Sequence, residues 1–176
     1  MIFTETPLKG AFVIELEEHR DARGFFARTF CRREFESQGI ELEIVQANFS
    51  YNRAAGTLRG LHWQEEPASE SKLVRCVQGS IYYVMVDLRS ESDTYGQHFG
   101  VELSADNKRS AFVPKLCANG FQSLRDETIV AYQMGEYYTP ASAAGYRYDS
   151  PALSISWPLS VTEISQQDLA WPQFTP

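Results

Sequence analysis

The sequence lacks any feature that would divide the chain or anchor it in a membrane. No repeat, low-complexity tract or linker rich in proline, glycine or serine interrupts its 176 residues. No run approaches the roughly 20 apolar residues of a membrane span, and residues 1–10 lack the apolar core of a signal peptide. We therefore expect one domain over residues 1–176, located in the cytoplasm and without a membrane partner.

Positive charge, cysteine and histidine are also scarce. The chain has 16 Lys and Arg residues against 23 Asp and Glu residues, and its net charge of −7 argues against nucleic acid as a partner. Its cysteines, Cys31, Cys76 and Cys117, are odd in number and far apart, which indicates reduced thiols rather than disulfides or a zinc site. The three histidines form no His-x-His pair, so a metal-dependent enzyme is poorly supported.

What the sequence does contain is a succession of short apolar or alternating runs between turn signals, with a high aromatic content of 13%. The runs predict strands at Ala11–Leu16, Gly24–Phe30, Leu42–Asn48, Lys72–Gly79, Ser80–Leu88, Gly96–Leu103, Ser110–Pro114, Thr128–Gly135 and Ser154–Trp157. The only convincing helix covers Arg32–Gln38 and ends at Gly39. Many short strands with few helices predict a mostly β fold, a jelly-roll sandwich or barrel.

Polar residues recur at alternate positions in the segment Arg59–Gln64. If the segment is extended, Gly60, His62 and Gln64 share one face, and the intervening residues share the other unless a bend redirects them. A strand face that carries His and Gln inside a barrel is costly unless it lines a wet or ligand-filled cavity. The plainer interpretation is that His62 is a hydrogen-bonded core histidine, and the pattern alone leaves both interpretations open.

From Thr4 to near Leu169 the sequence resembles the dTDP-4-dehydrorhamnose 3,5-epimerase family of jelly-roll cupins. The matching stretches are Asp21–Phe26, Gln46–Ser50, Leu58–Gln64, Lys72–Arg75, Val86–Arg89, Ser92–Gly96, Tyr132, Tyr137, Tyr138, Trp157–Pro158 and Ser165–Asp168. They are spread over almost the whole chain, and together they are highly specific. The resemblance favours a catalytic role for His62 over a purely structural one.

The resemblance implies an epimerase that needs no cofactor. A ketone at C4 of a sugar acidifies the hydrogens on C3 and C5, so a base can form an enolate and an acid can return a proton to the opposite face. By resemblance His62 is the base, and Asp168 orients its ring. Lys72 would stabilise the enolate oxygen, and Tyr132 would be the acid. Without the resemblance, Tyr132 would be interpreted as a core aromatic residue of a strand.

The resemblance also implies binding residues for a nucleotide-diphosphate sugar. Arg59 and Arg23 would pair with the diphosphate, and Tyr138 would stack on the base. Arg23 would reach in from a partner subunit, which implies a homodimer with exchanged N-terminal strands. Gln46 and Asn48 match further ligand contacts, although hydrogen bonding within a turn or sheet is an alternative explanation for both.

The sequence departs from the family where a second His–Asp pair is usual. Tyr83 and Asn119 occupy these positions, and we predict that they are neighbours at the cavity wall that leave His62 as the only base. Three other positions that usually contact ligand also differ, namely Arg28, Ala144 and Gln167, and Arg28 reverses a charge. These changes suggest preserved proton chemistry on an altered substrate or with altered regiochemistry.

Three alternatives stay open on the sequence. The enzyme could be a monofunctional 3-epimerase of a GDP- or CDP-linked 4-keto sugar. It could be a metal-dependent cupin, although the scarcity of histidine argues against this. It could also be a non-catalytic sugar-nucleotide binder, which the change at Asn119 favours and the retention of His62, Lys72, Tyr132 and Asp168 disfavours.

Overall fold

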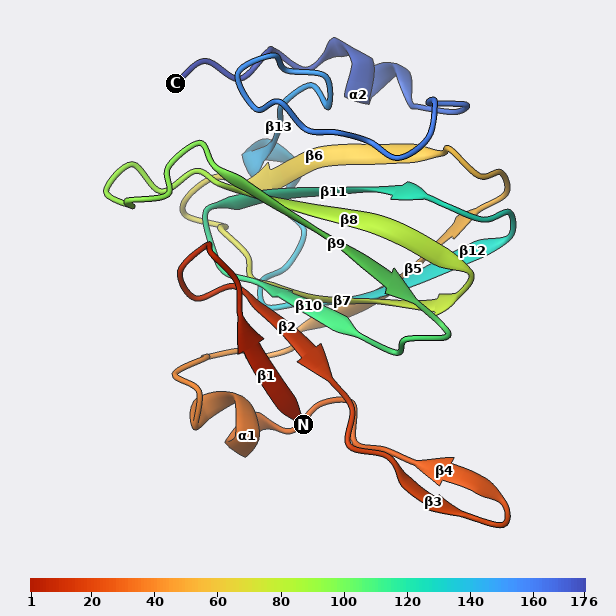
Figure 1. Cartoon of the computed structure of the whole chain (residues 1–176). Coiled ribbons are helices and arrows are strands. Elements are labelled where there is room, and N and C mark those ends of the chain that lie inside the picture. The colour runs from red at the N-terminus through yellow and green to blue at the C-terminus, as the bar shows by residue number, and fades with distance from the viewer.

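The computed structural model describes residues 1–176 as two antiparallel sheets that face each other (Figure 1). In spatial order the larger sheet contains β1 (Ile2–Glu5), β2 (Phe12–Glu15), β10 (Ser110–Val113), β7 (Lys72–Gln78), β12 (Thr128–Met134) and β5 (Gln46–Asn52). The smaller sheet contains β13 (Ala143–Gly145), β6 (Leu58–Gln64), β11 (Cys117–Ser123), β8 (Ser80–Asp87) and β9 (His98–Ser104). This double sheet confirms the predicted mostly β, jelly-roll class.

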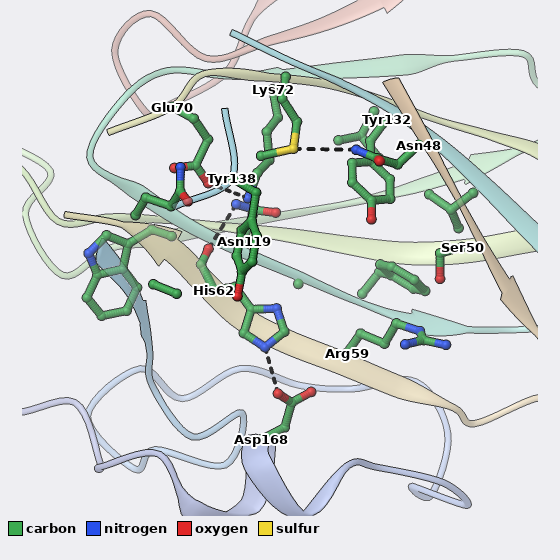
Figure 2. Close-up of a pocket in the computed structure, with 18 of the residues that line it drawn as sticks. Asn48, Ser50, Arg59, His62, Glu70, Lys72, Asn119, Tyr132, Tyr138 and Asp168 are labelled. Atoms are coloured by element: carbon green, nitrogen blue, oxygen red, sulfur yellow. Dashed lines mark hydrogen bonds and ion pairs between the residues drawn. The ribbon is translucent and has the colours of Figure 1, made fainter. Parts of the chain in front are cut away.

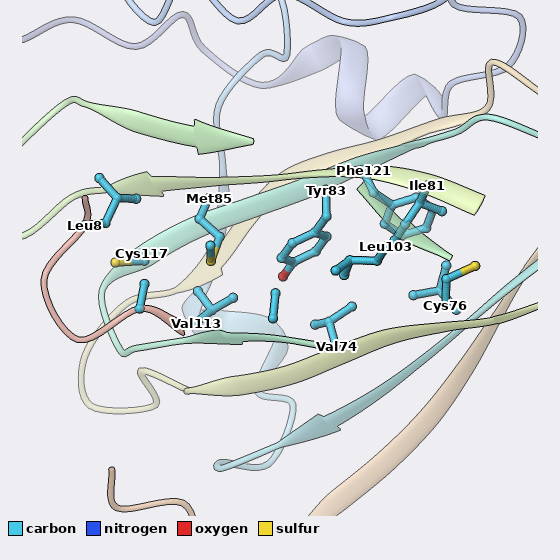
Figure 3. Close-up of a cluster of buried hydrophobic side chains, with 13 residues drawn as sticks. Leu8, Val74, Cys76, Ile81, Tyr83, Met85, Leu103, Val113, Cys117 and Phe121 are labelled. Carbon is cyan, nitrogen blue, oxygen red and sulfur yellow. The ribbon is translucent and has the colours of Figure 1, made fainter. Parts of the chain in front are cut away.

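The main core lies between the two sheets, and β8 shows how the sequence produces it. Successive side chains of a strand point to opposite faces, so Ile81, Tyr83 and Met85 all enter the core between the sheets (Figure 3). Val84 and Val86 point the other way, into a second cluster that the C-terminal segment covers. Because both of its faces are buried, β8 is a continuous apolar run instead of a clean alternation.

A third, two-stranded sheet formed by β3 (His19–Asp21) and β4 (Gly24–Phe26) projects away from the other two (Figure 1). Every residue of these two strands is exposed, and the side chain of Phe26 is 70% accessible. An isolated hairpin is at best marginally stable in water. Phe25, the residue before it, is also exposed, so this hairpin presents two adjacent phenylalanines to solvent.

Most of the predicted strands agree with the structure to within a few residues, and the exceptions have physical causes. The prediction for Ser154–Trp157 is wrong, because Ile155 and Trp157 pack as irregular chain against the outer face of the smaller sheet. The strand predicted at Gly24–Phe30 ends at Phe26, and the one predicted at Leu42–Asn48 is displaced to Gln46–Asn52.

The helices are short, as the sequence predicts. They are α1 (Arg32–Glu36), α2 (Gln166–Ala170) and a 3₁₀ turn, η1 (Pro140–Ser142). The predicted helix therefore ends two residues early, and the chain turns through Gly39, whose φ of +73° suits glycine. Helix α2 was not predicted. No helix combines the length and apolar character that crossing a lipid bilayer requires.

Candidate active site

One cavity of about 580 Å³ opens between the two sheets. Nine of the eleven predicted site residues line it: Gln46, Asn48, Arg59, His62, Lys72, Asn119, Tyr132, Tyr138 and Asp168 (Figure 2). A cavity of this size is in the range that holds small organic ligands, about 300–1,000 Å³. Sequence segments more than one hundred residues apart therefore converge on a single ligand-sized space.

His62 and Asp168 form a close polar pair in this cavity. Nε2 of His62 lies 2.6 Å from Oδ1 of Asp168, and the side chain of His62 is 42% exposed. Since a carboxylate accepts hydrogen bonds, Nε2 of a neutral ring carries the hydrogen and Nδ1 is left as the acceptor. Figure 2 shows Asp168 on one side of the ring and the cavity on the other. The pair thus presents a basic nitrogen to the cavity.

Helix α2 brings Asp168 to the histidine. Oγ of Ser165 accepts a hydrogen bond of 3.0 Å from the backbone N–H of Asp168, which caps the helix. Burial raises the pKa of the Asp168 carboxyl, but hydrogen bonds from His62, the Gly60 N–H and Ser165 outweigh this effect and lower its pKa below the usual value. Asp168 therefore remains ionised, as a residue that orients an imidazole must.

A bulge in β6 places Arg59 and His62 on the same side of the sheet. His62 pairs with Asn119, but Arg59 pairs with Phe121, so three steps along β6 match two along β11. The backbones meet closely here, since a Cβ on Gly60 would lie 2.7 Å from Cα of Gly120. The bulge is the kind of bend that the sequence analysis allowed as an exception to the alternation, and it brings Arg59 to the face of His62.

The larger sheet supplies the opposite wall of the cavity. Tyr132 lies in the middle of β12, where it pairs with Asn48 of β5 and with Val74 of β7. Asn48 accepts a hydrogen bond of 3.3 Å from Gln46, which in turn accepts one of 3.2 Å from the Tyr138 N–H. Because His62 and Tyr132 come from facing sheets, a flat ligand in the cavity would have one of them on each side.

Lys72 begins β7 and is paired with a residue that the sequence analysis missed. Its Nζ lies 2.6 Å from Oε1 of Glu70, and the two side chains are only 12% and 2% exposed. Residues i and i+2 of an extended chain share a face, so the proximity of Glu70 to Lys72 could have been expected from spacing alone. The ammonium keeps donors free for a ligand, since it has three.

Tyr83 and Asn119 are neighbours on adjacent strands, as predicted. Tyr83 pairs with Phe121 and Asn119 pairs with Met85, so the two lie diagonally on the cavity wall. Nδ2 of Asn119 donates a 3.0 Å hydrogen bond to the His62 carbonyl oxygen. The Tyr83 hydroxyl is buried and has no hydrogen-bond partner. Burial first, and then the nearby Glu70 carboxylate and Cys117, raise the pKa of this hydroxyl.

Arg23 and Arg28 do not belong to the cavity of their own chain. Arg23 lies in the projecting hairpin, bonded to Asp21, with a side chain that is 90% exposed. Arg28 forms an exposed ion pair of 2.8 Å with Glu34 near the N-terminus. Their predicted contacts with a ligand would therefore require a second subunit. In contrast, Ala144 and Gln167, the other two altered positions, both line the cavity.

Tyr138 lies at the cavity mouth and is 56% exposed, so a ring face is accessible there. Gln64 is buried and has a structural role, because it bonds the Ala68 and Tyr137 carbonyls and the Thr139 N–H. These bonds hold the segment that carries Tyr138. The structure contains no group of three or more His, Cys, Asp or Glu side chains placed to hold a metal ion.

A histidine paired with a carboxylate, a lysine and a tyrosine on the facing wall of a jelly-roll cavity are the groups that a proton-transferring isomerase uses. The family model described as dTDP-4-dehydrorhamnose 3,5-epimerase matches residues 5–176. A protein of that name from Methanothermobacter thermautotrophicus is 44% identical over 172 residues, which cover 96% of this chain and 92% of the relative.

Solved structures agree with this match. An epimerase of the same name from Bacillus anthracis, with TDP and PPi bound, is 39% identical, with a TM-score of 0.95 and coverage of 98% of this chain and 99% of that chain. An enzyme from Legionella pneumophila, in complex with dTDP-4-keto-L-rhamnose, is 38% identical, with a TM-score of 0.91 and coverage of 98% and 92%. The chain belongs to the dTDP-4-dehydrorhamnose 3,5-epimerase family and is an isomerase.

Proposed function

We propose that the chain epimerises a dTDP-linked 4-keto-6-deoxyhexose at C3, C5 or both, with His62 as the base. The observation that supports this most is the 2.6 Å contact between Nε2 of His62 and Asp168, because it leaves Nδ1 free to accept a proton inside the cavity. The bound TDP and dTDP-4-keto-L-rhamnose in the two similar structures support a dTDP-linked substrate over a GDP- or CDP-linked one.

The reaction needs only proton transfers. Nδ1 of His62 removes a proton from a carbon next to the C4 ketone, and the electron pair of that C–H bond moves to the C4 oxygen to give an enolate. The Tyr132 hydroxyl, from the facing sheet, donates a proton to the opposite face of the carbon, and the electrons return to re-form the ketone. The imidazolium and the tyrosinate then exchange protons with solvent, so the enzyme returns to its starting state.

Lys72 stabilises the intermediate. Its ammonium is largely buried, where the surroundings have a lower effective dielectric constant than water and a charge stabilises a developing oxyanion more strongly. The Glu70 carboxylate holds the ammonium in place, which reduces the rearrangement needed when the enolate forms. Asp168 has the equivalent function for the imidazolium, since its negative charge stabilises the protonated ring.

The nucleotide would occupy the outer part of the cavity. Arg59 is exposed at this wall, and its Nε is fixed by a 2.9 Å hydrogen bond to the Asn52 side chain, so its remaining N–H groups can meet a diphosphate. Tyr138 is exposed at the mouth, where its ring is free to stack on thymine. The Gln46 and Asn48 amides line the same cavity and would bond further polar groups of the ligand.

We also propose a homodimer in which each subunit extends its β3–β4 hairpin to the other. Phe26 is 70% exposed on this hairpin, and Phe49 is 76% exposed on the outer face of β5. Burial of such side chains stabilises an association of two copies. Arg23, 90% exposed beside Phe26, would then add a cation to the partner's diphosphate site. Arg28, near the base of the hairpin, would lie close to the same interface.

The proposed activity can be tested by NMR in deuterated water with wild-type protein and 4-keto-6-deoxyglucose linked to dTDP, GDP and CDP in turn. We expect deuterium at C5, C3 or both, with the dTDP-linked sugar fastest. No deuterium at any ring carbon would contradict the proposed reaction. A faster reaction on the GDP- or CDP-linked sugar would contradict the nucleotide but not the chemistry.

The proposed exchange between subunits can be tested by mixing two defective variants. Arg23→Ala and His62→Ala chains are unfolded together and refolded as mixed dimers. If Arg23 acts across the interface, the mixture contains one complete site in each mixed dimer, and activity returns to about a quarter of the wild-type value at limiting substrate. A mixture that stays as inactive as the average of its components would show that Arg23 does not act in trans.

A further inference from the structure

Two buried polar atoms of the cavity have no role in the mechanism above. Oε2 of Glu70 and the hydroxyl of Tyr83 have no hydrogen-bond partner, although both residues line the cavity. The Glu70 side chain is 2% exposed and Tyr83 is 1% exposed. Buried polar atoms in proteins are nearly always hydrogen-bonded. Ser50 Oγ and Trp171 Nε1 of the same cavity are also buried without a partner, and these exceptions point to groups that a ligand supplies. Glu70 and Tyr83 differ from the other two in lying near each other, since the Glu70 carboxylate contributes to raising the pKa of the Tyr83 hydroxyl.

The two atoms approach the cavity from opposite walls, and the Glu70 side chain is bonded to Lys72. Glu70 precedes β7 of the larger sheet, and its other oxygen, Oε1, lies 2.6 Å from Nζ of Lys72. Tyr83 belongs to β8 of the smaller sheet and points into the space between the sheets (Figure 3). Burial raises the pKa of the Tyr83 hydroxyl, and the Glu70 carboxylate is close enough to raise this pKa further. A group between them would therefore touch both sheets.

The chemistry of the two atoms selects a hydroxyl group. An ionised carboxylate can only accept a hydrogen bond, whereas a phenol can donate one. A hydroxyl between them can donate to Glu70 and accept from Tyr83, so all three groups are satisfied. A ketone oxygen would satisfy only Tyr83, and a methyl group would satisfy neither.

We propose that Glu70 and Tyr83 bind the C3 hydroxyl of the substrate. The assignment to C3 rests on the proposed function, which places the C4 oxygen at Lys72. Of the two carbons next to C4, only C3 bears a hydroxyl, since C5 bears the methyl group and the ring oxygen. Glu70, bonded through one oxygen to the ammonium that holds the C4 oxygen, has its second oxygen available for the group on the next carbon.

This contact makes Glu70 and Tyr83 specificity residues of the sugar site. A sugar without the C3 hydroxyl would leave both atoms unpaired, as they are in the free protein, and would react more slowly. The contact also restrains the C3 centre, because inversion at C3 would move the hydroxyl away from its two partners. Inversion at C5 has no such restraint.

The test is a cycle of enzyme variants and substrate analogues. The dTDP-linked 4-keto-6-deoxyglucose is compared with its 3-deoxy and 2-deoxy analogues, and kcat/KM is measured for deuterium incorporation at C5. The enzymes are wild type, Glu70→Ala and Tyr83→Phe, with Glu41→Ala as a control, since Glu41 is exposed and outside the cavity. Comparing analogues within each enzyme cancels any general effect of the substitution on Lys72.

We expect the 3-deoxy analogue to react at least about tenfold more slowly than the parent sugar with wild type and with Glu41→Ala. In Glu70→Ala the ratio of kcat/KM for the parent sugar to kcat/KM for the 3-deoxy analogue should fall to about threefold or less. In Tyr83→Phe this ratio should lie between the Glu70→Ala value and the wild-type value. The ratio of kcat/KM for the parent sugar to kcat/KM for the 2-deoxy analogue should be the same in all four enzymes. Tyr83→Phe, which removes one atom, keeps the test decisive if Glu70→Ala does not fold.

An unchanged 3-deoxy penalty in both variants would overturn the proposal and would indicate that a bound water satisfies the two atoms. If the variants instead lose the rate difference between the parent sugar and the 2-deoxy analogue, Glu70 and Tyr83 bind the C2 hydroxyl. That result would also overturn the proposal. If wild type exchanges no ring proton of the parent sugar, the proposed function itself fails. That result differs from the first two, in which wild type remains active.

Discussion

The Asp168 carboxylate and the pair formed by Glu70 and Tyr83 differ in how completely they are bonded within the chain. Asp168 accepts hydrogen bonds from His62 at 2.6 Å and from the Gly60 N–H at 3.2 Å. In contrast, Glu70 and Tyr83 each keep a buried oxygen without a partner. The first arrangement is complete before substrate binds, as a catalytic base requires. The second is complete only with a ligand present, as a recognition site requires.

The largest effect is expected at the part of the cavity that contains His62 and Asp168. We expect His62→Ala to reduce deuterium incorporation at every ring carbon by about 10²–10⁴-fold or more, because His62 is the proposed base for each exchange. The matched control is His98→Ala, since His98 lies in β9 and outside the cavity. Incorporation by His62→Ala close to the wild-type rate would rule out His62 as the base.

The next effect concerns the facing wall. Tyr132→Phe removes the hydroxyl and preserves most of the packing in β12, so His62 can still form the enolate. We expect net inversion to fall at least about tenfold more than deuterium exchange with retention. The two rates come from one NMR time course in deuterated water. Equal losses of exchange and inversion would mean that Tyr132 is not the acid of the far face.

A smaller effect is expected for the residue that orients the base. Asp168→Asn should reduce kcat by about 10–100-fold, because His62 is retained and only its orientation and charge support are weakened. A loss as large as that of His62→Ala would contradict this expectation and would mean that the ring tautomer and orientation set by Asp168 account for nearly all of the activity.

The same variant tests the pKa of Asp168, which is lowered in the folded protein. A carboxyl whose pKa is lower in the folded than in the unfolded protein stabilises the fold at pH values above its unfolded pKa, which is near 4. This contribution to stability is lost as the pH falls through the pKa of the folded protein. Urea unfolding should therefore show Asp168→Asn to be less stable than wild type at pH 7 by about 1–2 kcal/mol. The difference should narrow below about pH 4. A constant difference down to pH 2 would contradict the lowered pKa.

The smallest effect is expected at the part of the cavity that contains Glu70 and Tyr83. Tyr83→Phe removes a buried hydroxyl that has no partner in the free protein, so it should raise the free energy of unfolding by about 1 kcal/mol. For a chain of this size that corresponds to a rise in Tm of about 2–4 °C. Thermal unfolding without ligand provides the measurement. A lower Tm would show that the hydroxyl is already satisfied and that the two parts of the cavity do not differ as described.

Local patterns predicted much of the sheet but not the contacts between distant segments. Alternating or buried runs such as Thr128–Met134 predicted strands because side-chain burial repeats every two residues. Strand β11 was missed, because Asn119–Gly120 has the composition of a turn. The close approach of Gly120 to Gly60, where a Cβ would meet backbone at 2.7 Å, explains why glycine is needed inside a sheet.

The candidate site was predicted mainly through the family resemblance. Nothing in local spacing links His62 to Asp168, which are 106 residues apart and meet because α2 packs beside β6. The bulge that turns Arg59 toward His62 depends on pairing with β11, so an isolated strand could not predict it. The spacing of Glu70, two residues before Lys72, predicts their proximity, but Glu70 belongs to none of the stretches that resemble the family.

The central claim is that one part of the cavity transfers protons while another holds a hydroxyl, and the relative rates at C5 and C3 test it most directly. Wild-type protein is incubated with dTDP-linked 4-keto-6-deoxyglucose in deuterated water, and inversion at each carbon is followed by NMR. With one base, His62, and with the C3 hydroxyl held by Glu70 and Tyr83, inversion at C5 should be much faster than at C3. Equal rates at the two carbons, or a faster rate at C3, would contradict the account.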